Sequence, residues 1–194
     1  AVVFTPRERD WQRNEVIVDN DGAGSYQEVK SRKGKWKTTS TPGFAMKRNI
    51  YADGQNPFTE GTARYANTEK KAEKAFAQWI PTIPETGKYA VYVSYQSLPE
   101  SVTDAKYLVF HKGGVTEFLV NQQIGGGTWV YLGSFEFDKG YNDYGMVVLS
   151  NQSKQKGVVC ADAVRFGGGM GNIARGGQTS GLPRYLEAAR YNAQ

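Results

Sequence analysis

Residue types that carry much of enzyme chemistry are scarce in this chain. Its 194 residues include one cysteine, Cys160, and one histidine, His111. A single cysteine excludes an internal disulfide and any zinc site built on several cysteines. A single histidine excludes a metal site with several histidine ligands, so we expect no metal and no cofactor. A Ser-His-Asp triad would have to use His111, and no serine lies in a nucleophile-elbow sequence.

Both residues have ordinary structural interpretations. Cys160 lies in the apolar run 158–161, which predicts a buried, unreactive thiol. His111 precedes the turn Lys112-Gly113-Gly114 and is expected at the surface, at the end of a strand. We therefore predict that the chain is not an enzyme.

Long apolar runs are also absent. No stretch is long enough to cross a membrane, and no secretory signal peptide can be identified. The chain begins at Ala1 and runs directly into strand-like sequence, as a segment cut from a longer protein would. We expect no membrane span.

Aromatic residues and glycine are abundant instead. The chain has 12 Tyr, 9 Phe, 4 Trp and 23 Gly, and hydrophobic residues make up 39% of it. That hydrophobic content is enough for a core. Aromatic side chains suit half-buried pleated sheets, and glycine supplies the turns between short strands. The composition therefore predicts an all-β fold.

Alternating apolar and polar residues locate the strands. In 88–96, Tyr92 lies on the face opposite Tyr89 and Tyr95. Segment 129–137 is predicted to place Trp129, Tyr131, Phe135 and Phe137 on one face. Segments 106–112 and 115–121 flank Gly113-Gly114, which is a typical hairpin turn.

Three more segments are predicted as strands: 74–80, 147–150 and 158–166. In the last, Asp162 alternates with Cys160 and Val164 on the expected inward face, so we expect it to be a buried, hydrogen-bonded structural carboxylate. Short strands without intervening helices favour a sandwich or jelly roll over a parallel α/β sheet.

The composition changes at both ends of this β region. Residues 167–181 are rich in glycine and are expected to be loop, and 183–193 resemble a short helix with Pro183 in its first turn. The run 167–172 is not a dinucleotide-binding loop, because no helix can open at its third glycine. We divide the chain into an N-terminal segment, 1–15, a β-sandwich module, 16–167, and a linker with a C-terminal helix, 168–194.

The charge is mildly basic. There are 24 Lys and Arg residues against 19 Asp and Glu, and much of the excess lies in 30–37, at Lys47 and Arg48, and in 70–74. Such runs can bind nucleic acid, but no nucleic-acid motif accompanies them. Solvated strand edges are the favoured interpretation, so we expect no nucleic-acid partner.

Asp19-Asn20-Asp21-Gly22, with Glu28 nearby, gathers the oxygen ligands that calcium prefers. The spacing does not match an EF-hand loop, and Asx turns use the same residues for their own backbone. The sequence leaves both interpretations open.

Exposed aromatic rings beside polar side chains could bind sugars, because sugar C–H faces stack on rings while hydroxyls form hydrogen bonds. Most tyrosines in a sandwich pack in its core, which is the alternative for each ring. Lysines around Trp36 argue for its exposure and would favour acidic glycans, and Tyr141 and Tyr144 lie in a turn-rich link. The candidate carbohydrate-binding residues are Trp36, Tyr51, Tyr92, Tyr95, Tyr141 and Tyr144.

Several separated motifs occur in a characteristic order. Residues 79–89 lead into the strand 90–95, and Val120-Asn121-Gln122-Gln123 and Gly127-Thr128-Trp129 precede the segment 159–166. With 17–21 as the opening strand, this series resembles the golvesin C-terminal-like domain, also described as a xanthan-lyase-type carbohydrate-binding-like domain. The resemblance implies a galactose-binding-like β-sandwich, or jelly roll, that accompanies catalytic domains.

The tail 1–10 has a weaker resemblance to a strand and turn of the zinc N-acetylmuramoyl-L-alanine amidases, although no zinc-ligand set is present. It implies a host catalytic domain outside these residues. We therefore predict a secreted, periplasmic or cell-surface accessory module whose partner is a glycan or polysaccharide. A structural spacer without a ligand is one alternative. Part of a hydrolase or lyase with its active site elsewhere is the other.

Overall fold

The computed structural model describes residues 15–22, 25–30, 34–45 and 56–167, together with the backbone of 172–173 and 177–180. Its regular structure is β apart from the 3-10 turn η2 (Pro57–Thr59). The strands are β1 (Val16–Asp19), β2 (Tyr26–Lys30), β3 (Trp36–Thr38), β4 (Arg64–Asn67), β5 (Ala75–Trp79), β6 (Thr82–Ile83), β7 (Gly87–Val93), β8 (Ala105–His111), β9 (Gly114–Val120), β10 (Val130–Phe137), β11 (Gly140–Tyr141), β12 (Met146–Ser150), β13 (Val158–Ala161), β14 (Ala163–Phe166), β15 (Asn172–Ile173) and β16 (Gly177–Ser180).

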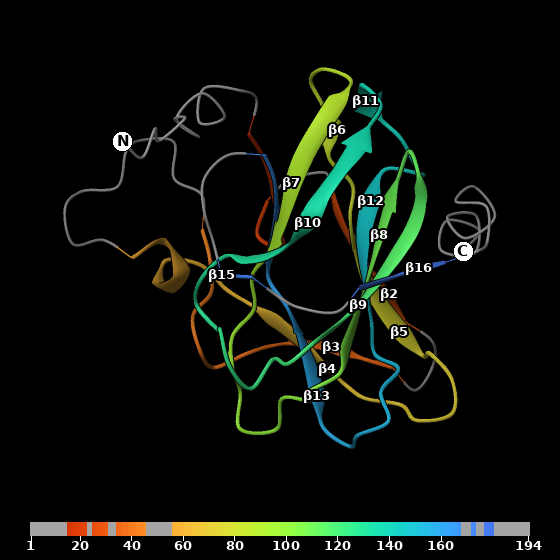
Figure 1. The fold of residues 1–194 in the computed structure, drawn as a ribbon. Helices are drawn as coiled ribbons and strands as arrows, with labels where there is room; N and C mark the ends of the chain where they lie inside the picture. The colour runs from red at the N-terminus through yellow and green to blue at the C-terminus, as the bar shows by residue number, and fades with distance from the viewer. Residues whose placement is uncertain are drawn as a thin grey trace, which may run out of the picture.

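Two large sheets form the sandwich (Figure 1). One has the order β1-β14-β7-β10-β15, and the other has the order β16-β9-β8-β12-β5-β2. Neighbouring strands are antiparallel except β15, which is parallel to β10. A three-stranded sheet, β13-β4-β3, closes one end of the sandwich, and the β6–β11 pair lies toward the other (Figure 1). The predicted all-β sandwich is confirmed.

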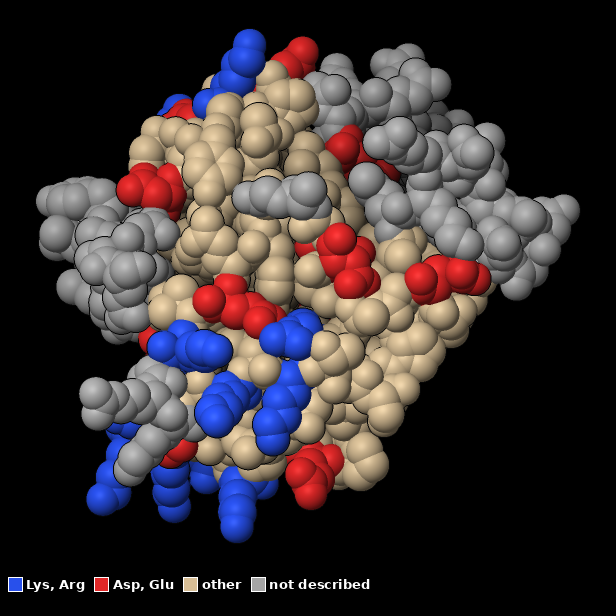
Figure 2. Space-filling view, turned by 180° about the vertical axis from the view of Figure 1, so that it is seen from behind, with Lys and Arg blue, Asp and Glu red and all other residues tan. Residues whose placement is uncertain are grey.

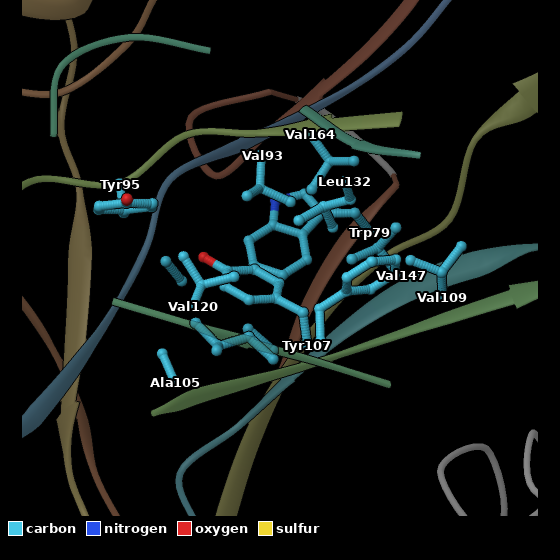
Figure 3. Packing of buried hydrophobic residues seen from close by; sticks show 14 of the residues in the cluster. Trp79, Val93, Tyr95, Ala105, Tyr107, Val109, Val120, Leu132, Val147 and Val164 are labelled. Carbon is cyan, nitrogen blue, oxygen red and sulfur yellow. The ribbon is translucent and has the colours of Figure 1, made fainter. Parts of the chain in front are cut away.

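Alternating residues of the two sheets meet in one core (Figure 3). Trp79 and Tyr107 from the six-stranded sheet stack with ring centroids 6.5 Å apart. Val93, Leu132 and Val164 from the five-stranded sheet belong to the same buried cluster. Truncating Trp79 to alanine would leave a large void, at a cost of about 3–5 kcal/mol.

The six-stranded sheet also has a second apolar face. Phe76, Leu108, Phe110 and Val148 form a separate buried cluster with Met146 and other neighbours. The strands β5, β8 and β12 therefore have apolar residues on both faces, and nearly every residue in them is buried. Burial on both faces produces the continuous hydrophobic runs in these segments.

Two strand predictions need correction. The aromatic residues of segment 129–137 do not all lie on one face of the sheet, because a bulge between Tyr131 and Gly133 shifts the register of β10 against β7. Tyr131 consequently faces away from the core, while Phe137 lies in it. A bulge adds one residue on one strand and reverses the alternation beyond it.

Segment 158–166 is likewise not one strand. It is divided at Asp162 into β13, which pairs with β4, and β14, which pairs with β1 and β7. The chain passes from the end sheet into the sandwich at this residue.

The glycine-rich segment 167–181, expected to be loop, includes the strands β15 and β16. Backbone pairing with β10 and β9 forms them despite their weak strand propensity. The predicted C-terminal helix at 183–193 and the host-like residues 1–14 lie outside the described residues. The hairpin at Gly113-Gly114 is present, with Gly114 at φ 133°, a backbone angle that favours glycine.

Candidate ligand-binding surfaces

Three of the predicted sugar-binding rings lie inside the protein. Trp36 is 7% exposed, Tyr92 is 4% exposed and Tyr95 is 1% exposed. The expectation that Trp36 is exposed is wrong, because β3 points its ring into the core and leaves Lys35 and Lys37 outside. None of these three rings offers a free face to a sugar in this structure.

Tyr95 has a clear structural role. Its hydroxyl lies 2.6 Å from the carbonyl oxygen of Ile124 and donates a hydrogen bond to it. Its own carbonyl accepts a hydrogen bond from the Gly127 N–H at 2.9 Å. The ring therefore anchors the loop 121–129 against the end of β7.

Tyr141 is the exposed ring among the described members of the predicted set. It lies in β11 opposite Thr82, and 52% of its surface is exposed. Tyr144 is half-buried and packs against the outer apolar cluster of the six-stranded sheet. Tyr51 lies outside the described residues. Sugar binding by these rings stays a prediction.

A second group of aromatic side chains, which we call the aromatic cluster, was not predicted from the sequence as a group, and only Tyr92 among its members was a candidate. The cluster consists of Phe44, Phe58, Tyr92, Trp129 and Tyr131. The ring centroids of Phe44, Phe58 and Trp129 lie 5.0 to 5.5 Å from one another. The Arg165 guanidinium lies over both Tyr92 and Trp129, at 5.2 and 5.9 Å from their centroids. Trp129 and Phe58 are only half-buried. Because four separate segments supply the cluster, only the loop-end position of Trp129 could have suggested it.

Asp162 lies beneath this cluster. Its carboxylate is fully buried and accepts the Phe44 N–H, with N···O distances of 3.0 and 3.2 Å. Burial raises the pKa of Asp162 from the usual value near 3.8 to about 7, although the bond from Phe44 lowers it. The prediction of a buried, hydrogen-bonded carboxylate is confirmed.

A neighbouring pocket of about 400 Å³ is lined partly by Asp19, Asp21 and Ser25. Asp19 is buried, and its Oδ1 atom has no hydrogen-bond partner. Burial first, and then the charges of Asp162 and Asp21, raise the pKa of Asp19 to about 8. The unpaired oxygen and the raised pKa favour a protonated carboxyl group at neutral pH.

The carboxylate oxygens of Asp21 and Glu28 that suggested calcium are engaged by the protein, whereas the Asn20 Oδ1 atom is buried without a hydrogen-bond partner among the described residues. Both carboxylate oxygens of Asp21 accept hydrogen bonds from Thr62. Glu28 forms a bidentate ion pair with Arg64, with N···O distances of 2.8 Å. Among the residues that the structure describes, no three histidine, cysteine, aspartate or glutamate side chains are placed to hold a metal ion together.

The nucleophile and base candidates are also engaged. His111 is not at the surface as expected. It is buried, lies 2.9 Å from the Thr116 hydroxyl and contacts the Phe135 ring. Cys160 is fully buried, and burial raises the pKa of its thiol to about 12. The thiolate form that reacts as a nucleophile is thus strongly disfavoured.

No helix in the described part of the chain is long and apolar enough to cross a membrane.

Comparison with known proteins gives one consistent result. Residues 16–168 match the family described as Golvesin C-terminal domain. The xanthan lyase of Bacillus sp. (strain GL1) is 32% identical over 154 residues, which are 78% of this chain and 14% of that enzyme. The solved structure of a Paenibacillus xanthan lyase matches with a TM-score of 0.61 and 25% identity, over 81% of this chain and 13% of that one.

The match thus spans nearly the whole sandwich but only about a seventh of either lyase. It extends from the first residue of β1 to just beyond the last residue of β14. The chain therefore belongs to the Golvesin C-terminal domain family.

Proposed function

We propose that this chain is a non-catalytic accessory module that binds polysaccharide for a larger, polysaccharide-acting protein. The observation that carries the proposal is its similarity to a small part of a xanthan lyase, 14% of that enzyme's length. Most of that enzyme lies outside the shared part, so the shared part suits a supporting role. On this proposal the larger protein works outside the cell, and the module is secreted, periplasmic or displayed on the cell surface.

The reactive side chains are buried or hydrogen-bonded within the protein, which supports a non-catalytic role. Within the described residues, His111 and Cys160 are buried, and the Asp162 carboxylate accepts a hydrogen bond from the Phe44 N–H. A general base must be able to contact a substrate proton directly or through one water. None of these three groups is placed to do so without rearrangement of the core.

Binding can be tested by affinity electrophoresis of the full chain in gels containing xanthan. We expect retarded migration relative to gels without polysaccharide. Tyr141→Ala tests the exposed ring, and Leu119→Ala is its control, because Leu119 is similarly exposed at 49%. Unchanged migration in xanthan and in other charged and neutral polysaccharides would contradict the proposal.

A structural spacer is the second candidate function. Burial of Trp36, Tyr92 and Tyr95 favours it, because a spacer needs no exposed aromatic platform. Failure of every polysaccharide to bind, with an intact fold by circular dichroism, would decide for the spacer.

A further inference from the structure

Exposed lysines gather at the end of the sandwich closed by β3, β4 and β13. They come from the segments 30–37, 67–74 and 151–157, and we call the described lysines of these segments the basic end. Figure 2 shows blue side chains crowded at the lower end of the molecule, where Figure 1 places this end sheet. In the sequence these three segments hold ten Lys and Arg residues and two glutamates.

Hydrogen bonds and close packing hold the three segments together. The Lys74 N–H donates to Asn151 Oδ1 at 2.9 Å, which joins the second segment to the third. The Thr68 hydroxyl donates to the Gln155 carbonyl at 2.7 Å. Gly34 packs so tightly on Lys74 that an added Cβ would lie 2.6 Å from the Lys74 carbonyl oxygen. The lysines therefore share one surface although they are far apart in sequence.

The described lysine side chains at the basic end are exposed to solvent. Lys35 and Lys37 flank the buried Trp36, and Lys70 and Lys71 lie in the turn after β4. In the described parts of the chain, no lysine of these segments lies in an ion pair, whereas Lys112 near the opposite end pairs with Asp138 at 3.3 Å. Crowded like charges repel one another, and a bound polyanion relieves that repulsion.

We propose that the basic end binds a polysaccharide that carries carboxylate groups, and this inference rests on the proposed function above. The described cations exposed there are lysines, whose rotatable ammonium groups suit irregularly spaced carboxylates. Arginine's planar fork suits bidentate contacts with carboxylate and phosphate alike, whereas lysine binds either anion as a point charge. The arginine of the described end sheet, Arg64 in β4, is already paired with Glu28. The similarity to part of a xanthan lyase, together with the lack of a nucleic-acid motif in the sequence, favours an acidic glycan over a nucleic acid.

The test compares two triple variants of the full chain with equal charge change. K35Q/K37Q/K71Q removes charge from the basic end, and K88Q/K112Q/K139Q removes the same charge from exposed lysines elsewhere. Binding to polygalacturonate, dextran and a single-stranded DNA is measured by biolayer interferometry at low and at physiological salt. Circular dichroism melts establish that both variants fold.

We expect the wild type to bind polygalacturonate in a salt-sensitive way, since exposed charges are screened within about 8 Å at 0.15 M salt. K35Q/K37Q/K71Q should lose about tenfold or more in affinity, and the control variant less than about twofold. Equal losses in the two variants, or loss only in Tyr141→Ala, would overturn the inference.

The remaining outcomes separate this inference from the proposed function. Equal binding of dextran and polygalacturonate would overturn the proposed role of the basic end, whereas the proposal of polysaccharide binding would still hold. Binding of DNA as tight as that of polygalacturonate would overturn the assignment to glycans. Binding of neither polysaccharide, nor of xanthan, would contradict the proposed function itself.

Discussion

Replacing Gln122 by methionine should destabilise the protein more than any exposed substitution of the same kind. The Gln122 side chain is fully buried between the end sheet and the sandwich. Its Oε1 atom accepts the Cys160 N–H at 2.8 Å, and its Nε2 atom donates to the Cys160 carbonyl at 2.9 Å. The amide thereby pairs with β13 as a neighbouring strand would. Nε2 also donates to the Tyr107 hydroxyl at 2.9 Å.

The expected cost follows from these three bonds. Methionine has a similar volume but cannot replace them, so the N–H and C=O of Cys160 would be left buried without this partner. Each orphaned group costs about 1–3 kcal/mol, so we expect a loss of about 3–5 kcal/mol in the free energy of unfolding. For a chain of this size, that corresponds to a fall in Tm of roughly 6–20 °C.

Urea unfolding followed by tryptophan fluorescence measures the loss directly. Gln123→Met is the matched control, because Gln123 is exposed and its side chain donates a hydrogen bond only from Nε2 to the Ser101 carbonyl, at 3.1 Å, among the described residues. It should cost less than about 1 kcal/mol. Equal stability of the two variants would refute the claim that the Gln122 amide serves β13 as a partner.

Two further predictions concern the buried carboxylates. Asp19→Asn should stabilise the protein more at pH 8 than at pH 5. Because the folded pKa of Asp19 is about 8, above the usual 3.8, the stability that protonation confers is complete below about pH 4 and is lost as pH rises toward 8. A Tm difference between variant and wild type that does not grow with pH would contradict this sign. Asp162→Ala at pH 5 should cost about 1–3 kcal/mol, because the Phe44 N–H loses its acceptor, and an unchanged thermal melt would argue against that role.

The strands could be predicted from the sequence where apolar and polar residues alternate within a single segment. Segment 88–96 and the hairpin at Gly113-Gly114 follow from period-two patterns and from turn chemistry alone. The bulge at Tyr131/Gly133 was not predictable, because it is defined by the register of β10 against β7. The break at Asp162 likewise depends on which sheets accept β13 and β14.

The candidate binding surfaces also depend on contacts between distant segments, which limits what the sequence can predict about them. Lysines around Trp36 suggested exposure, yet Lys35-Trp36-Lys37 is also the alternation of a strand that is buried on one face, and this second pattern was the informative one. The basic end brings together residues 30–37 and 151–157, more than a hundred positions apart, because both contact Lys74, and only the fold supplies these contacts. The aromatic cluster is assembled from distant segments in the same way.

The most direct test of the account is to measure binding and turnover of xanthan by the same sample. The full chain is incubated with xanthan, bound protein is measured by co-sedimentation, and new unsaturated ends are followed by ultraviolet absorbance. We expect the chain to be retained on the polysaccharide with no rise in absorbance. Turnover that disappears in His111→Ala, or a chain that stays wholly in the supernatant, would contradict it.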